Sequence, residues 1–274
     1  MRSALAAFRT RGLSPKRSFG QNFLADARIA ARIAGLATTP EGGTVVEIGA
    51  GLGALTEPLL ARASTVIAIE RDRDLCPILR EVYAESLERG TLTLIEADAK
   101  KVDLAALAEM GPPPRVVVGN LPYQLTGPLL QAVTGIADRL DAVVFMVQAE
   151  VADRLAARPG TSAYGALTVF VTAAFAVHRE MKIPPQAFSP QPRVDSAVVT
   201  LLPRRPPLAV ETEPFRSLVR AAFAQRRKTL RNAWSKLAPP AELAQRAARA
   251  GIDLDRRGET LGVEDFARFA RALP

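Results

Sequence analysis

The tetrapeptide Asn120-Leu121-Pro122-Tyr123 has residue types suited to chemistry on the exocyclic amine of adenine. The lone pair of that amine is delocalised into the ring, so an enzyme must hold the NH₂ with acceptors that favour a tetrahedral nitrogen. The side-chain carbonyl of Asn120 and the backbone carbonyl of Leu121, held rigid by Pro122, provide two acceptors. Tyr123 provides a ring on which an unstacked base can lie. The same residues also fit an ordinary turn with a capping Asn, so their position in the fold decides between the two.

A glycine-rich stretch, 49–54, follows the β-branched run 44–48 and precedes a helix predicted over 55–63. Glycines let a backbone approach a ligand closely, and a helix N-terminus offers unpaired N–H groups. Glu70 ends the next predicted strand about 20 residues beyond Gly49, where a carboxylate can accept hydrogen bonds from both hydroxyls of a ribose. These features predict a nucleotide-type site. They fit an NAD dehydrogenase and an S-adenosylmethionine (SAM) enzyme about equally.

Two further acidic residues favour SAM. Glu47 stands just before the glycines, where it would repel a pyrophosphate and attract a ligand that carries an ammonium and a sulfonium. Asp98 follows the third predicted strand, at the sheet edge where an adenine amino group could donate to it. Either acid could instead cap a helix or lie at the surface. Together with Gly49, Gly51 and Glu70, they predict SAM as the cofactor.

The elements that position these residues are predicted from their apolar runs. Strands are predicted at 44–48, 65–69, 91–96, 115–118 and 142–148, and most are almost wholly apolar. Such strands are buried on both faces, as in a parallel sheet with helices on either side. The prediction is an α/β fold with a doubly wound, Rossmann-like sheet of the SAM-dependent methyltransferase type. In this sheet the fourth strand brings Asn120 to the same edge as the glycines.

Beyond these strands we expect a helix over 164–177, a strand over 195–202 and a proline-rich linker over 203–207. One helix is predicted over 215–234, and on it Arg216, Arg220, Arg227 and Arg231 fall within an arc of about 60°. That stripe is either a binding surface or a solvated face. Two domains follow: 1–203, a Rossmann-like methyltransferase domain with a basic N-terminal extension, and 204–274, a small helical domain.

The positive charge of the chain is concentrated in two segments. The 274 residues include 36 Lys and Arg against 28 Asp and Glu, for a net charge of +8. Residues 1–20 contain five basic and no acidic side chains, and residues 204–236 contain nine basic and two acidic ones. Two basic segments on a mildly acidic body indicate a polyanionic partner, although basic residues are also common on solvated faces.

The composition argues against several other classes of protein. Cys76 and His178 are each the sole residue of their type, which excludes an internal disulfide framework and disfavours metal sites built on Cys or His. No metal is therefore expected. No uncharged apolar run of about 18 residues occurs, and residues 1–13 lack a secretory pattern. We expect a cytoplasmic protein that does not contact a membrane.

Five segments in order resemble the family of small-subunit rRNA adenine N6,N6-dimethyltransferases (KsgA/RsmA type). The segments are 16–24, 46–51, 120–123, 188–196 and 222–232, and the resemblance covers nearly the whole chain. Any one segment is weakly specific, whereas five in the same order are highly specific. Ala50 departs from the family, in which Pro is frequent at this position, and we expect a looser turn with unchanged chemistry.

The resemblance implies site residues and a function. SAM would be bound by Asn22, Leu24, Gly49, Glu70, Asp98 and Asn120, and Phe188 would join Tyr123 around the target adenine. RNA contacts are predicted at Lys16, Arg17, Arg220, Arg227, Lys228 and Arg231. The implied activity is SAM-dependent dimethylation of N6 on two adjacent adenosines near the 3′ end of small-subunit (16S-type) rRNA. The implied partner is the immature small ribosomal subunit, bound by a monomer with a role in subunit biogenesis.

Other functions stay open from the residues alone. Related loops serve N6-adenine methylation of DNA and glutamine methylation of protein, but no DNA-reading module is evident in this sequence. A ribosome-assembly factor whose main work is binding is a third possibility, against which the intact glycine loop and Asn120 argue. An NAD dehydrogenase is the weakest alternative, because it predicts nothing at 120–123.

Overall fold

The computed structural model describes residues 2–122, 124–225 and 227–271. The chain forms two compact units, Met1–Ala152 with His178–Pro203, and Asp153–Val177 with Arg204–Pro274. The predicted domains were 1–203 and 204–274, and Pro203 is the last residue of the first unit. Residues 153–177, however, belong to the second unit and not to the first. None of the described helices is long and apolar enough to cross a membrane.

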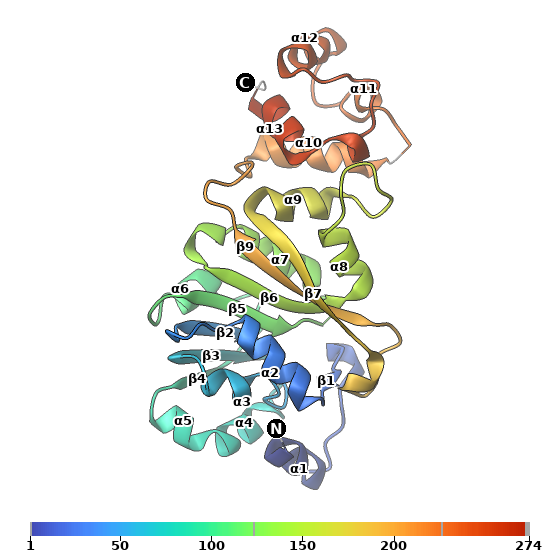
Figure 1. The fold of residues 1–274 in the computed structure, drawn as a ribbon. Coiled ribbons are helices and arrows are strands. Elements are labelled where there is room, and N and C mark those ends of the chain that lie inside the picture. Colours follow the sequence, from blue (N-terminus) through green and yellow to red (C-terminus); the bar gives the residue numbers. More distant parts are fainter. Residues whose placement is uncertain (1, 123, 226, 272–274) are drawn as a thin grey trace. The chain divides into compact units, whose positions relative to one another are not determined.

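The first unit is built on a seven-stranded sheet in the order β4-β3-β2-β5-β6-β9-β7. The strands are β2 (Thr44–Ile48), β3 (Thr65–Glu70), β4 (Leu92–Glu96), β5 (Arg115–Asn120), β6 (Ala142–Gln148), β7 (Phe175–Ile183) and β9 (Ser196–Pro203). Strands β2 to β6 pair in parallel, and β9 pairs antiparallel with β6. Helices lie on both sides of the sheet (Figure 1), as buried strands such as β2 require. The predicted doubly wound α/β fold is thereby confirmed.

The helices of the first unit lie before, between and after its parallel strands along the chain. They are α1 (Arg2–Thr10), α2 (Ala27–Leu36), α3 (Thr56–Leu60), α4 (Cys76–Val82), α5 (Ala84–Glu88), α6 (Leu104–Ala108), α7 (Thr126–Thr134) and α8 (Ala149–Leu155), the last of which ends in the second unit. The Asp26 carboxylate caps α2 by accepting from the amides of Arg28 and Ile29. Helix α3 is shorter than the predicted 55–63.

The register of the central strands aligns the residues at their ends. Ile48 of β2 pairs with Ile69 of β3 on one side and with Gly119 of β5 on the other. The next residues along these strands are Gly49, Glu70 and Asn120, so they stand side by side at one edge. The strand order reverses at β2, which is where ligands bind in open α/β sheets.

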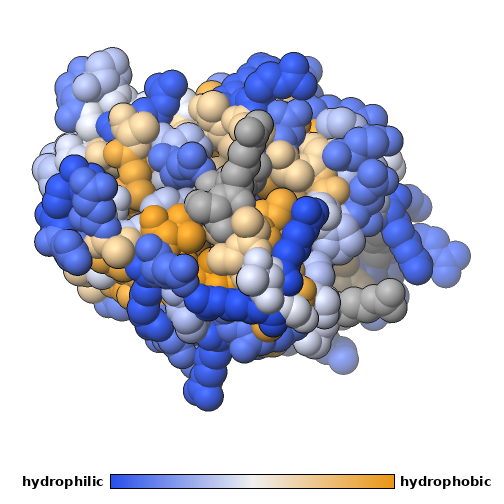
Figure 2. Space-filling model, turned by 90° about the horizontal axis from the view of Figure 1, so that it is seen from below, coloured by the Kyte–Doolittle hydropathy of each residue, from blue (hydrophilic) through white to orange (hydrophobic). Residues whose placement is uncertain are grey.

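The N-terminal helix α1 is docked onto the same unit. Ala4 and Phe8 are buried against Leu52, Leu75 and Ile78, in a small cluster beside the glycine-rich loop. Figure 2 shows the end of the molecule at which Figure 1 draws α1, α4 and α5. Apolar side chains gather near the middle of that face, and hydrophilic ones surround them.

A two-stranded sheet joins distant parts of the first unit. Strand β1 (Phe23–Leu24) pairs antiparallel with β8 (Phe188–Ser189), so that Leu24 lies opposite Phe188. The N-terminal segment and the segment before β9 are therefore held together, although more than 160 residues separate them in the sequence.

The second unit is helical. Its helices are α9 (Ala166–Ala174), α10 (Glu213–Ala224), α11 (Leu230–Ala233), α12 (Pro240–Ala250) and α13 (Val263–Arg271). Trp234 is fully buried, and its ring lies 4.3 Å from that of Phe269. Tyr164 and Val169 belong to the same core, and the Tyr164 hydroxyl donates to the Leu261 carbonyl. These contacts explain why 153–177 belongs to this unit.

Two predicted helices differ in the structure. The helix over 164–177 ends at Ala174, and Phe175 begins β7 at the edge of the sheet. The single helix over 215–234 is also wrong, since α10 ends at Ala224 and α11 starts at Leu230. The amides of Leu230 and Arg231 donate to the carbonyls of Arg256 and Leu254, so the backbone there bonds to a neighbouring loop. The predicted stripe of four arginines on one helix face therefore does not form.

Candidate active site

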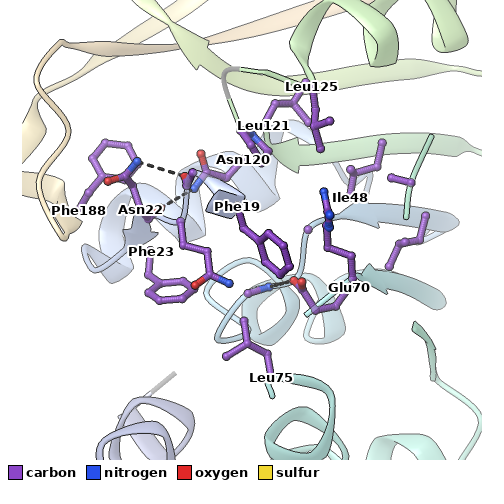
Figure 3. A pocket seen from close by; sticks show the side chains of 18 of the residues that line it. Phe19, Asn22, Phe23, Ile48, Glu70, Leu75, Asn120, Leu121, Leu125 and Phe188 are labelled. Carbon is purple, nitrogen blue, oxygen red and sulfur yellow. Dashed lines mark hydrogen bonds between the residues drawn. The ribbon is translucent and has the colours of Figure 1, made fainter. Parts of the chain in front are cut away.

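A pocket opens at the carboxyl edge of β2, β3 and β5. Its lining consists of residues 19–23, Ile48, Gly49, Gly51, Ile69, Glu70, Arg71, Leu75, Ala97, Ala99, Asn120, Leu121, Pro122, Leu125, Phe188, Pro192 and Ser196. In Figure 3, Glu70 and Leu75 lie at one end of the view and Asn22, Asn120 and Phe188 at the other. All of these residues belong to the first unit.

The glycine-rich loop forms one wall of the pocket with backbone atoms. Gly49 and Gly51 have φ values of +76° and +58°, which other residues rarely adopt. The amides of Gly49 and Ala50 both donate to the carbonyl of Ile69, so the loop is tied to the end of β3. A side chain at Gly51 would also press against the ring of Phe23. Backbone is thus exposed to a ligand on this wall.

Glu70 presents an oriented carboxylate to the pocket. Its Oε2 accepts from the amide of Gly51 and its Oε1 from the amide of Asp72, each at 2.8 Å. Burial raises the pKa of Glu70, while hydrogen bonds from the amides of Asp72, Gly51 and Arg71 oppose that rise. These amides fix the orientation of a carboxylate that lines the pocket, and a carboxylate can accept hydrogen bonds from the hydroxyl groups of a ligand.

Asn120 ends β5 with its side chain in the pocket. Its Nδ2 donates to the backbone carbonyl of Asn22 at 3.1 Å (Figure 3), and among the described residues its Oδ1 accepts no hydrogen bond. The opposite orientation would set two oxygens against each other. The next residue, Leu121, is buried, and its amide donates to the carbonyl of Met146. Tyr123, predicted to stack on the base, lies outside the described residues.

Phe188 lies at the Asn120 end of the pocket. Its pairing with Leu24 in the β1–β8 sheet holds it there, and its side chain is buried. It packs in the core as well as lining the pocket. The structure thus brings together Asn22, Asn120, Leu121, Pro122 and Phe188 from the predicted site.

Three residues predicted to bind the cofactor do not line the pocket. Leu24 is buried in the main core of the first unit. Glu47 is buried, and its Oε2 accepts from the Thr56 hydroxyl at 2.6 Å, so it does not reach a ligand directly. Asp98 accepts from the amide of Lys100, and its neighbours Ala97 and Ala99 line the pocket in its place. Strand alternation explains Glu47, because successive side chains point to opposite faces.

Sequence reasoning did not single out Phe19, Arg71 or Leu75. The guanidinium carbon of Arg71 lies 4.2 Å from the centre of the Phe19 ring, and both residues line the pocket. A cation over an aromatic face is attractive. Phe19 lies within the quoted segment 16–24, whereas no pattern in the sequence marks Arg71.

The predicted RNA-binding residues have different surroundings. Arg220, Arg227 and Lys228 are exposed in the second unit. Arg231 pairs with Asp255 at 3.1 Å, and Lys16 pairs with Asp72 at 2.5 Å and with Asp74 at 2.6 Å. Arg231 and Lys16 therefore each form an ion pair with acidic residues of this chain. The Arg17 side chain lies outside the described part of the structure.

Comparison with known proteins agrees with this geometry. A family model described as ribosomal RNA adenine dimethylase matches residues 12–273. The chain belongs to this family. A ribosomal RNA small subunit methyltransferase A of Moorella thermoacetica is 47% identical over 279 residues, covering 98% of this chain and 96% of that protein. One from Anaeromyxobacter sp. (strain K) is 46% identical over 273 residues, covering 95% and 94%.

Two solved structures of methyl-transferring enzymes resemble this chain over most of its length. A dimethyladenosine transferase from Plasmodium falciparum has a TM-score of 0.76 and 26% identity, covering 90% of this chain and 95% of that chain. The 23S rRNA methyltransferase ErmE has a TM-score of 0.67 and 26% identity, covering 92% and 99%. The Rossmann-like methyltransferase fold and the membership in an rRNA methyltransferase family are thereby confirmed.

The surroundings of Glu47 predict a pH dependence of stability. Burial raises the pKa of Glu47 from 4.5 to about 8, although the Thr56 hydroxyl opposes that rise. Between these values the unfolded chain ionises while the folded chain keeps its proton, so the free energy of unfolding falls as pH rises. The slope is up to about 1.4 kcal/mol per pH unit. Glu47→Gln lacks this contribution, so its free energy of unfolding should not show this fall with pH. The difference in free energy of unfolding, Glu47→Gln minus parent, should therefore be about 3 kcal/mol larger at pH 7.5 than at pH 5.5.

Urea unfolding at the two pH values measures this difference. Glu85→Gln, at a carboxylate that is largely exposed, is the matched control and should follow the parent at both pH values. Equal slopes for Glu47→Gln and the parent protein would show that Glu47 is ionised in the folded state.

Proposed function

We propose that this protein transfers methyl groups from SAM to N6 of two adjacent adenosines near the 3′ end of small-subunit rRNA. The observation that carries the proposal is the row of Gly49, Glu70 and Asn120 at one sheet edge, in a member of the rRNA adenine dimethylase family. The relatives named small subunit methyltransferase A support the choice of the small subunit.

The pocket residues fit SAM at the Glu70 end. The Glu70 carboxylate, oriented by backbone amides, suits a ribose diol, and the bare backbone at Gly49 and Gly51 allows close approach of the ligand. Apolar side chains from Ile69 and Leu75 can enclose the flat adenine ring. Bound SAM supplies an electrophilic methyl group. Glu47, two residues before Gly49, is bonded to the Thr56 hydroxyl and lies outside the pocket lining.

The Asn120 end fits the target adenine. The free Oδ1 of Asn120 and the backbone carbonyl of Leu121 accept the two hydrogens of the amine, so its lone pair turns towards the methyl donor. Phe188 provides an aromatic surface beside Asn120 for the extruded base. Tyr123 provides a second one in our proposal. A strong general base is unnecessary, because the proton leaves after the methyl group has been transferred.

The polyanionic partner is the immature small ribosomal subunit. The exposed Arg220, Arg227 and Lys228 of the second unit are the cations best suited to its phosphates. In this proposal the protein acts as a monomer in the cytoplasm, and its methylation accompanies subunit biogenesis.

Labelled methyl transfer from SAM to small subunits that lack the modification tests the function. After digestion to nucleosides, we expect the label in N6,N6-dimethyladenosine, at two positions near the 3′ end of the rRNA. Label in protein, in DNA or in cytosine would contradict the proposal, and each of these results would identify one of the alternative substrates.

Asn120→Ala should lower the transfer rate, whereas Glu70→Ala should weaken SAM binding. Loss of an acceptor aimed at the reacting amine costs on the order of 3 kcal/mol, or about a hundredfold in the transfer rate, and Asn120→Ala should leave the SAM dissociation constant nearly unchanged. Glu70→Ala removes the ribose contact, so the SAM dissociation constant should rise. Calorimetric SAM binding and single-turnover transfer measure the two effects. Near-normal transfer by Asn120→Ala would contradict a catalytic role for this loop.

The second unit should make subunit binding sensitive to salt. Each phosphate contact contributes about 0.7 to 0.9 to the slope of log affinity against log salt. Replacement of Arg220, Arg227 and Lys228 by Gln should therefore weaken binding and flatten that slope by up to about 2.7, because three contacts are lost. A matched variant with Gln at Arg32, Arg62 and Lys101, which are exposed in the first unit, should keep the parental slope. If both variants keep it, the cations at 220–228 form an ordinary solvated face.

A further inference from the structure

Asp72 is a buried carboxylate outside the pocket lining, and both of its oxygens bind the N-terminal segment. Lys16 Nζ lies 2.5 Å from Oδ1, and Gln21 Nε2 donates to Oδ2 at 2.6 Å. Only 2% of Asp72 is exposed, whereas the pairs elsewhere along this segment, such as Arg11 with Glu81, are open to solvent. The carboxylate thus fastens residues 16 and 21 at the same time.

The backbone of Asp72 is fixed to the cofactor side of the pocket. Its amide donates to Oε1 of Glu70 at 2.8 Å, and its carbonyl accepts from the amides of Leu75 and Cys76. Asp72 is therefore held at the turn between β3 and α4, independently of its side chain. A firm anchor point for the N-terminal segment results.

The interaction is strong enough to keep Asp72 ionised. Burial by itself would raise the pKa of Asp72, but the hydrogen bonds from Lys16, from the amide of Asp74 and from Gln21 outweigh it and hold the pKa below its usual range. A buried carboxylate without such partners would be costly. The position of segment 16–21 is therefore coupled to the charge of Asp72.

Hydrogen bonds within segment 16–21 join its first and last residues. The contacts of Asp72 with Lys16 and Gln21 therefore also fix the position of Asn22, the next residue. The Lys16 amide donates to Oε1 of Gln21 at 2.7 Å, and the Phe19 and Gln21 amides donate to the Lys16 carbonyl. Asn22 follows directly, and its carbonyl accepts from Nδ2 of Asn120. That bond turns the Asn120 oxygen away from Asn22 and leaves it available in the pocket.

We propose that Asp72 is a positioning residue, which fastens segment 16–21 so that the Asn22 carbonyl orients the Asn120 amide for transfer. The assignment rests on the proposed function, because it gives Asn120 its role as acceptor of the target amine. It also changes the interpretation of Lys16, which serves this tie and not an RNA phosphate.

Asp72→Asn tests the proposal directly. An amide has one acceptor oxygen, so Asn at this position cannot accept from Lys16 and Gln21 together, and one contact becomes donor against donor. We expect the transfer rate at saturating SAM to fall about tenfold or more, since small displacements of a reacting group have effects of this size. SAM affinity should fall as well, because residues 19–22 line the pocket. Lys16 keeps its pair with Asp74, and the substitution removes a negative charge, so weaker RNA binding does not explain the loss.

Glu81→Gln is the matched control. It removes a carboxylate that also ties the N-terminal region to α4, through Arg11, but this pair is exposed and distant in sequence from Asn22. Surface ion pairs contribute little, so this variant should transfer methyl groups at the parental rate. Lys16→Met, which keeps the buried carboxylate, should reproduce the direction of the Asp72→Asn effect if Asp72→Asn fails to fold.

A double-mutant cycle with Asn120→Ala separates positioning from a general structural role. If Asp72 acts through Asn120, Asp72→Asn should reduce the saturated rate little further in the Asn120→Ala background, while it still weakens SAM binding. The same rate loss in both backgrounds would overturn the proposal. A parental rate for Asp72→Asn at saturating SAM would overturn it too.

Hydrogen exchange gives a readout that does not depend on methyl transfer. Amides of residues 16–23 should exchange faster in Asp72→Asn than in the parent protein, and those of β2 should be unchanged. Equal protection of residues 16–23 in both proteins would contradict the claim that Asp72 fastens segment 16–21. Should the parent protein transfer no methyl group to adenosine, the proposed function fails, and the exchange result still decides whether Asp72 holds the segment.

Discussion

The parallel pairing of β2 with β3 on one side and β5 on the other is the constraint on which the site depends. Because Ile48 lies level with Ile69 and Gly119, the residues that follow these three strands meet at one edge. A shift of one residue in either pairing would turn the following side chains to the other face of the sheet. The apolar character of these strands, which are buried on both faces, sets the register, so packing in the core determines the geometry of a polar site.

Three acidic residues near the glycine-rich loop have different states because their neighbours differ. Glu47 is buried, which favours its protonated carboxyl group, although the hydrogen bond from the Thr56 hydroxyl opposes this effect. Glu70 is also buried, but it accepts from two backbone amides and faces the pocket. Asp72 has the ammonium of Lys16 beside it and stays ionised. The protonation state of each of these carboxyl groups therefore depends on its own hydrogen-bond partners, and the number of acidic residues does not give the charge of the site.

Sequence patterns predicted the parts of the fold that depend on buried apolar runs. Strands β2 and β6 have the predicted bounds, and Gly49, Glu70 and Asn120 share an edge as expected. The break after Ala224 was missed because helical periodicity does not register that Leu230 and Arg231 bond to a distant loop. Residue order alone does not show that the Glu47 side chain is buried against Thr56 and lies outside the pocket lining. The Phe19–Arg71 contact and the tie at Asp72 join residues more than 50 positions apart, and a single sequence carries no record of such pairings.

The chain passes from the first unit to the second after Ala152, returns at His178 and leaves again after Pro203. The core around Trp234 therefore contains residues made early, such as Val169, and residues made last, such as Phe269. During synthesis the sheet can close before the second core has its full set of side chains. Until α10 and α13 are complete, the apolar face of α9 lacks its full set of partners from that core, and such surfaces favour aggregation. The order of synthesis thus gives this protein a vulnerable interval that a chain with consecutive domains would avoid.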